Sequence, residues 1–145
     1  MEDSLREFHS KYGHLISTSP TTDLQWRVKL LRETLIKEEF EELMLAIDQD
    51  DLVEIADGAA DLIYVIVGTC VSYGIPIERV FKEVHRSNMT KTAIKAEGGS
   101  KYGTKTPKGP DYIPPDIKTI LFSGNRTKLE RMANPTTDVE DVNIE

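Results

Sequence analysis

Two acidic stretches joined by a short polar connection decide how this chain folds. They read Glu38-Glu39-Phe40-Glu41-Glu42 and Glu54-Ile55-Ala56-Asp57-Gly58-Ala59-Ala60-Asp61. Apolar residues recur at helical spacing around the first stretch, and residues 24–47 contain neither glycine nor proline. The connection at 48–51 is short, so the sequence predicts helices over 24–47 and 52–73 that pack antiparallel.

Strand is the competing interpretation for residues 62–71, because this run is rich in valine and isoleucine. We favour helix, because the acids before the run and the length of the whole segment fit a helix better. The second half of this helix is apolar nearly all round, which predicts burial by a bundle core or by a partner subunit.

Shorter helices are predicted on both sides of the hairpin. One covers about 3–14, and another covers about 76–90 after Gly74 and Pro76, while Asp23 is a candidate cap for the helix at 24–47. Beyond residue 93 glycine and proline dominate, with a short helix possible near 117–122 or 126–133. The fold class expected is all-α: an antiparallel bundle of four to five helices in a domain at 1–117, followed by a partly flexible extension at 118–145.

The amino-acid composition of the chain excludes several classes of protein. The 145 residues are 39% hydrophobic and 30% charged, which suits one globular domain, and the net charge of −7 argues against a nucleic-acid partner. The single Cys70 excludes an intramolecular disulfide framework and a Cys-cluster zinc site. With no apolar signal segment and no long apolar run, we expect a cytoplasmic protein without a membrane partner.

The acids on the two predicted long helices lie in one arc on each helix, and the metal prediction applies if the two arcs face each other. At about 100° per residue, Glu38, Glu39 and Glu42 share one side of their helix, and Glu54, Asp57 and Asp61 share one side of theirs. Converging carboxylates repel one another unless they are protonated or bridged by cations, and all-oxygen ligands select Mg²⁺ or Mn²⁺. The pattern therefore predicts a divalent-metal site inside the hairpin.

Two alternatives compete with this metal site. The acids can simply be the solvated face of two surface helices. A di-iron carboxylate site needs Glu-x-x-His motifs, and His9, His14 and His85 all lack a glutamate three residues earlier.

Motifs along most of the chain carry a family resemblance. They are Glu39-x-x-Glu42, Glu54-x-x-Asp57, Glu7-Phe8-His9-x-x-Tyr12-Gly13, Leu62-Ile63-Tyr64-Val65, Gly68-Thr69, Val84-His85-Arg86-Ser87-Asn88-Met89-Thr90-Lys91, Lys108-Gly109-Pro110 and Pro114-Pro115-Asp116. Together, over about residues 5–117, they resemble the all-α nucleoside triphosphate pyrophosphohydrolases, the MazG-like, dimeric dUTPase-like and phosphoribosyl-ATP pyrophosphohydrolase-like group.

The resemblance implies dimers or tetramers and Mg²⁺-dependent cleavage of a nucleoside triphosphate between its α- and β-phosphates. It implies metal ligands at Glu38, Glu39 and Glu42, with Glu38 or Glu39 also orienting the attacking water. On the next helix Asp57 fits by motif and Asp61 by the phrase that follows it, so both are kept and Glu54 ranks below them. If Asp61 is aligned with the aspartate of the family motif, Gly58 stands where many relatives carry glutamate.

Cationic and aromatic residues complete the predicted substrate site. Arg86, Lys91 and Lys108 are candidates for phosphate contacts, and Asn88 for the sugar or base. Tyr64, Trp26 and His85 are candidate lining residues that also fit packing roles. The expected activity is nucleotide-pool housekeeping on an unusual or surplus (d)NTP such as dUTP; the alternative is a non-catalytic helical oligomeric adaptor.

Overall fold

A computed structural model of the chain describes residues 1–92 and 106–123. Its elements are all helical: α1 (Glu2–Tyr12), α2 (Trp26–Asp48), α3 (Leu52–Tyr73), α4 (Ile77–Asn88) and α5 (Ile117–Phe122). The all-α prediction is confirmed, and the strand alternative for 62–71 is wrong. The predicted helix at 126–133 and most of the predicted extension lie outside the described residues.

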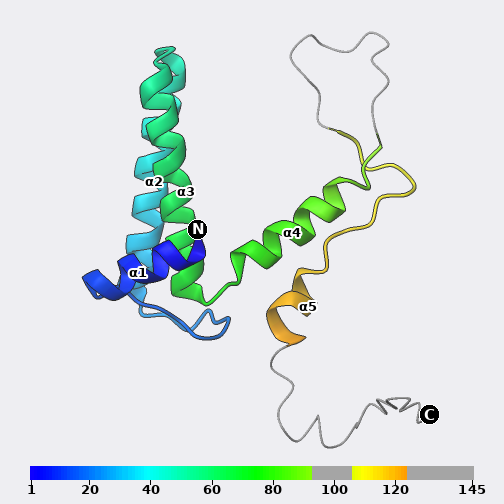
Figure 1. Ribbon diagram of the computed structural model, residues 1–145, viewed down its shortest axis with the longest axis horizontal. Coiled ribbons are helices and arrows are strands. Elements are labelled where there is room, and N and C mark those ends of the chain that lie inside the picture. Colours follow the sequence, from blue (N-terminus) through cyan, green and yellow to red (C-terminus); the bar gives the residue numbers. More distant parts are fainter. Residues whose placement is uncertain (93–105, 124–145) are drawn as a thin grey trace, which may run out of the picture.

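The two long helices, α2 and α3, run side by side as the predicted antiparallel hairpin, and α1 lies across the base of the hairpin (Figure 1). The buried core sits at that base, where Leu5 of α1 packs with Val67 and Val71 of α3. Thus α1 covers part of the apolar second half of α3 within a single chain.

Local sequence sets most helix ends. The Asp51 side chain caps α3 by accepting hydrogen bonds from the backbone N–H groups of Val53 and Glu54, at 3.0 and 3.2 Å. Gly74 ends α3 in the left-handed conformation, with φ of 65°. The prediction that Asp23 caps α2 is wrong. Helix α2 begins after Gln25, and no side chain caps it. Asp23 lies two residues earlier, where its backbone N–H donates a hydrogen bond to the hydroxyl of Thr21.

The loop between α1 and α2 is fastened to the end of α3. The Ser17 hydroxyl donates to the carbonyl of Ser72 at 2.6 Å, and the buried Ser72 hydroxyl donates to the carbonyl of Leu15 at 3.2 Å. A side chain at Gly74 would overlap the carbonyl of Ser19, so only glycine fits there. These contacts fix α1 and its loop relative to the hairpin.

Beyond the hairpin, α4 leads away from the base of α3, and the segment around 106–116 returns alongside it to α5 (Figure 1). Buried Ser87 of α4 donates its hydroxyl to the carbonyl of Ile113 at 2.8 Å. The side chain of Asp116 caps α5 by accepting from the N–H of Thr119. Hence α5 belongs to the same unit as α4.

By length and hydropathy alone, α3 is the one described helix that could span a membrane. The central helix of a bundle meets the same criterion, and α3 packs against both α1 and α2. Packing on two sides buries part of this apolar surface, while Ile63 and Ile66 stay exposed in the single chain.

Candidate functional site

The acidic stripes of α2 and α3 are held together by a close helix–helix contact. A Cβ built on Gly58 of α3 would lie only 3.2 Å from the Cα of Leu43 on α2. A side chain at this position would require the Leu43 backbone to shift by a few tenths of an ångström. The close contact places the glutamates of α2 beside the aspartates of α3.

Glu39 is the acid of the two stripes whose surroundings raise its pKa. Its pKa is raised, chiefly because burial removes its carboxyl group from water, and further because Asp61, Glu42, Glu38 and Asp57 surround it with negative charge. Carboxylates of both helices therefore act on one side chain. The grouping of these acids from two helices around Glu39 is the main feature of the candidate site.

The remaining members of this group are open to solvent. Glu38, Glu42, Asp57 and Asp61 are exposed, whereas Glu39 is partly buried. Within residues 1–92 and 106–123, no three His, Cys, Asp or Glu side chains converge closely enough to hold one ion as they stand. The oxygen-only donor set nevertheless fits Mg²⁺ or Mn²⁺ by its chemistry.

Glu54 stands apart from the group. It lies in the first turn of α3, where its backbone N–H is bound by Asp51, and its charge is not among those that raise the pKa of Glu39. Glu54 is therefore not among the acids that act on Glu39. Both Asp57 and Asp61 remain candidates.

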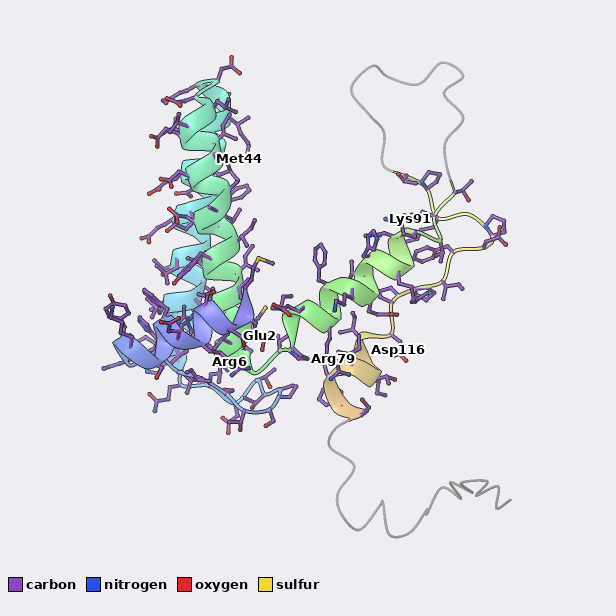
Figure 2. All side chains as sticks on the ribbon, in the orientation of Figure 1. Glu2, Arg6, Met44, Arg79, Lys91 and Asp116 are labelled. Atoms are coloured by element: carbon purple, nitrogen blue, oxygen red, sulfur yellow. The ribbon has the colours of Figure 1, made fainter. Side chains whose placement is uncertain are left out.

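The predicted phosphate-binding residues lie on a different part of the chain. Figure 2 shows Lys91 at the far end of α4, remote from the hairpin on which Met44 is labelled. Arg86 forms a two-point hydrogen bond with Glu83, at 2.7 and 2.9 Å, and also donates to the carbonyl of Pro114. Lys108 lies 4.9 Å from the ring centre of Tyr112. These cations are not brought to the acidic side of their own chain, and exposed His85 and Asn88 share α4 with them.

The two predicted aromatic residues have different surroundings. Trp26 is exposed at the start of α2, with the guanidinium of Arg27 5.5 Å from its ring centre. Tyr64 meets Phe8 edge to face at 5.5 Å and lines a cavity one helical turn beyond Asp61. Of the two, only Tyr64 adjoins the acidic stripe.

That cavity holds about 280 Å³ between α1, α2 and α3. Its wall is made of residues from all three helices and the loop after α1: Leu5, Phe8, His9, His14, Leu31, Arg32, Leu35, Tyr64, Val65 and Gly68. Neither Arg32 nor His9 was predicted from the sequence as a site residue, although both line this cavity. The available signal was a lone arginine among the apolar positions Leu31 and Leu35 of α2.

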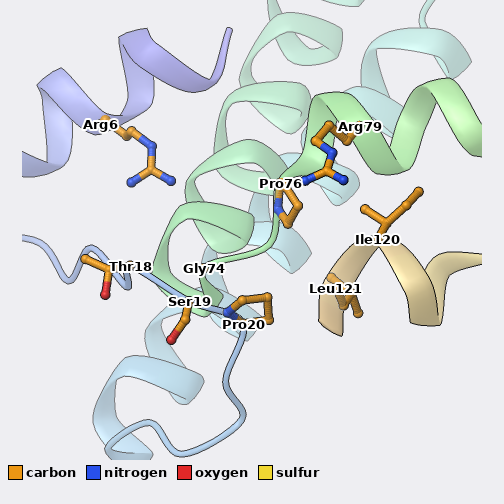
Figure 3. A pocket seen from close by; sticks show the side chains of 9 residues that line it. All are labelled: Arg6, Thr18, Ser19, Pro20, Gly74, Pro76, Arg79, Ile120 and Leu121. Atoms are coloured by element: carbon orange, nitrogen blue, oxygen red, sulfur yellow. The ribbon is translucent and has the colours of Figure 1, made fainter. Parts of the chain in front are cut away.

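A second cavity, also of about 280 Å³, lies between α1, the following loop, the α3–α4 turn and α5 (Figure 3). Arg6 and Arg79 both line it. Arg6 is already bound to Glu2, to which it donates two hydrogen bonds at 2.9 and 3.3 Å. Arg79 lines the same cavity from the first turn of α4.

Comparison with known proteins agrees with the geometry. No curated protein matches the chain. The family model described as phosphoribosyl-ATP pyrophosphohydrolase matches residues 5–88, which is more than half of the chain and includes α2, α3 and both acidic stripes. An all-α fold with coupled carboxylates on a central hairpin suits a MazG-like pyrophosphohydrolase. The chain belongs to the phosphoribosyl-ATP pyrophosphohydrolase family.

Proposed function

We propose that this protein is a Mg²⁺-dependent nucleoside triphosphate pyrophosphohydrolase that releases a (d)NMP and pyrophosphate. Family membership supports the reaction class. The single structural observation that carries the proposal is Glu39, whose pKa is raised by burial and by acids of both α2 and α3. Repelling carboxylates on a hairpin are stabilised when a divalent cation lies between them.

Five acids would hold the metal: Glu38, Glu39, Glu42, Asp57 and Asp61. When bound, the ion neutralises phosphate oxygens and positions the triphosphate. Glu39, with its raised pKa, is the better placed of the two candidate bases to take a proton from the water that attacks the α-phosphorus. Glu38 is the second candidate for this role.

Turnover assays test the assignment directly. Pyrophosphate release is measured for the common NTPs and dNTPs, for dUTP, and for phosphoribosyl-ATP, the compound in the family's name. Glu42→Gln and Asp61→Asn should each abolish Mg²⁺-dependent turnover while the helical fold persists. Glu41→Gln is the matched control, because Glu41 is exposed, pairs with Lys37 at 3.8 Å and does not act on Glu39. Near wild-type rates in both site variants would defeat the assignment.

We propose that the protein self-associates, and its exposed apolar surface supports this. Phe40 and Leu45 of α2, Ile63 of α3 and Phe81 of α4 are all at least half exposed in the single chain. Surfaces of this kind mark interfaces. A dimer or tetramer would cover them, and α4 of a partner is the element free to bring Arg86, Asn88 and Lys91 toward the acids. We assign the protein to the cytoplasm, without nucleic-acid or membrane partners.

The second candidate function is a non-catalytic helical adaptor. The exposure of Glu38, Glu42, Asp57 and Asp61 is the observation that favours it, because solvated acids need no metal. An adaptor would show no pyrophosphate release with any substrate and no response of its stability to Mg²⁺.

A further inference from the structure

Arg32 of α2 is a buried charge that pairs with no acid among residues 1–92 and 106–123. Its side chain is only 5% exposed, and its Nε has no hydrogen-bond partner in the part of the chain that the structure describes. Burial lowers the pKa of the guanidinium, and no carboxylate offsets that effect. Burying an unpaired charge is unfavourable, so a cavity that retains one is suited to an acceptor brought by a ligand.

The cavity in front of Arg32 has aromatic and apolar walls. Phe8 and His14 stack at 5.8 Å with an interplanar angle of 10°, and Tyr64 meets Phe8 edge to face. Leu31 and Leu35 of α2 complete an apolar lining. Aromatic and apolar walls with a few fixed polar groups are typical of sites for planar organic ligands.

The polar edge of the cavity is a donor beside an acceptor. The Nδ1 of His9 lies 2.9 Å from the carbonyl of Leu15, which can only accept, so Nδ1 carries the proton. Burial lowers the pKa of His9, which leaves the ring neutral and its Nε2 an acceptor. A Cβ at Gly68 would lie 3.1 Å from this Nε2 and 3.3 Å from Nη1 of Arg32. Glycine thus keeps open the space that both groups face.

The cavity continues the acidic side of the hairpin. Tyr64 is three residues beyond Asp61 on α3, and Arg32 is seven residues before Glu39 on α2, which is about 10 Å along the helix. A ligand whose phosphates lie at the acids therefore has its organic end within reach of Arg32.

We propose, on the basis of the function proposed above, that this cavity takes the nucleobase and that Arg32 and His9 select a base with a carbonyl beside a ring N–H. Uracil, thymine, guanine and hypoxanthine have that edge. The guanidinium has only donors and binds the carbonyl, while Nε2 of His9 accepts from the ring N–H. Cytosine and adenine present these atoms in the reverse order, with a ring acceptor beside an exocyclic N–H, so either base must shift by one atom position to satisfy both groups. With the phosphates held at the acids, that shift makes binding less favourable.

Matched substrates test this selection. The kcat/KM values for dUTP and dCTP, and for dGTP and dATP, are compared in the wild type and in Arg32→Met. We expect the wild type to prefer dUTP and dGTP, and the variant to lose at least about 10-fold more on these two than on their partners. An equal loss on all four substrates, or a wild-type preference for dCTP and dATP, would overturn the proposal.

Binding without phosphates separates this inference from the proposed reaction. Deoxyuridine binding, followed by ligand-detected NMR without metal, should disappear in Arg32→Met and persist in Glu42→Gln. If no triphosphate is hydrolysed yet deoxyuridine binds in this pattern, the reaction fails and the base pocket stands. If dNTPs are hydrolysed but Arg32→Met binds deoxyuridine as the wild type does, the base pocket fails alone.

A stability measurement excludes a purely structural role. Because Arg32 has no internal partner, Arg32→Met should melt at the wild-type temperature or above it. A large drop in melting temperature would mean that Arg32 supports the fold, which contradicts the proposal. Gly68→Ala is the second variant: its methyl group enters the space between His9 and Arg32 and should weaken deoxyuridine binding.

Discussion

Gly58 of α3 packs closely against Leu43 of α2, the other acid-bearing helix: a Cβ at position 58 would lie 3.2 Å from the Leu43 Cα. The contact lies next to Asp57 in sequence and next to Glu42 on the other helix. Separating the helices here therefore moves the carboxylates apart. The packing of Gly58 against Leu43 therefore helps to set the spacing of the acids in the candidate metal site.

A larger side chain at Gly58 should loosen the hairpin. Gly58→Val forces atoms into the Leu43 backbone and should cost about 2 kcal/mol or more, from overpacking. Ala60→Val, at an exposed position of the same helix, controls for the helix propensity of valine and should cost about 0.5 kcal/mol. Urea unfolding measures both values, and equal costs would show that the close contact does not constrain position 58.

Divalent metal should stabilise the fold. Binding to the native state alone raises the melting temperature in proportion to the logarithm of metal concentration, and at 100 times Kd the gain is about 2.7 kcal/mol. Millimolar Mg²⁺ or Mn²⁺ should therefore raise the melting temperature of the wild type and of Glu41→Gln. The rise should be absent in Glu42→Gln and Asp61→Asn; a similar rise in all four proteins would point to a nonspecific salt effect.

Glu39 should make the metal-free protein less stable as the pH rises. Its pKa in the folded state is raised above the ordinary 4.5, chiefly by burial and then by its acidic neighbours. The native state therefore binds the proton more tightly, and this contribution is present below pH 4.5 and lost as the pH rises through the raised value. Unfolding between pH 4 and 7 should show a flatter profile for Glu39→Gln than for the wild type, while Glu41→Gln keeps the wild-type slope.

Glu83 should show the opposite pH dependence in the α4–α5 unit. Hydrogen bonds from Arg86 and from the N–H of Asp116 lower its pKa to about 2. The charged form is favoured in the fold, so its contribution is present above pH 4.5 and is lost as the pH falls toward 2. Hydrogen exchange of the Asp116 amide, at 2.8 Å from Glu83 Oε1, should accelerate in Glu83→Gln. Glu78→Gln should leave that amide protected, because Glu78 contacts the N-terminus instead.

The cation sites show where sequence reasoning reached its limit. Arg86 matches the family phrase by residue type, yet its guanidinium is held by Glu83 and Pro114, three residues and 28 residues away. Arg32 lies in an otherwise ordinary amphipathic helix, and the packing of α1 and α3 around it buries it beside His9. The spacing of a residue from its neighbours in the sequence does not specify its partners elsewhere in the fold.

The sequence by itself determined the helices, the glycine that ends α3, the turn between the long helices and the acidic stripes, because helical periodicity and capping depend on neighbours within a few residues. Tertiary structure alone decided that α1 closes a cavity over Arg32, that the segment near Ile113 fastens to Ser87, and that Glu39 is the acid whose proton affinity rises. These outcomes depend on burial and on contacts between residues far apart in the chain, which no pattern of spacing specifies.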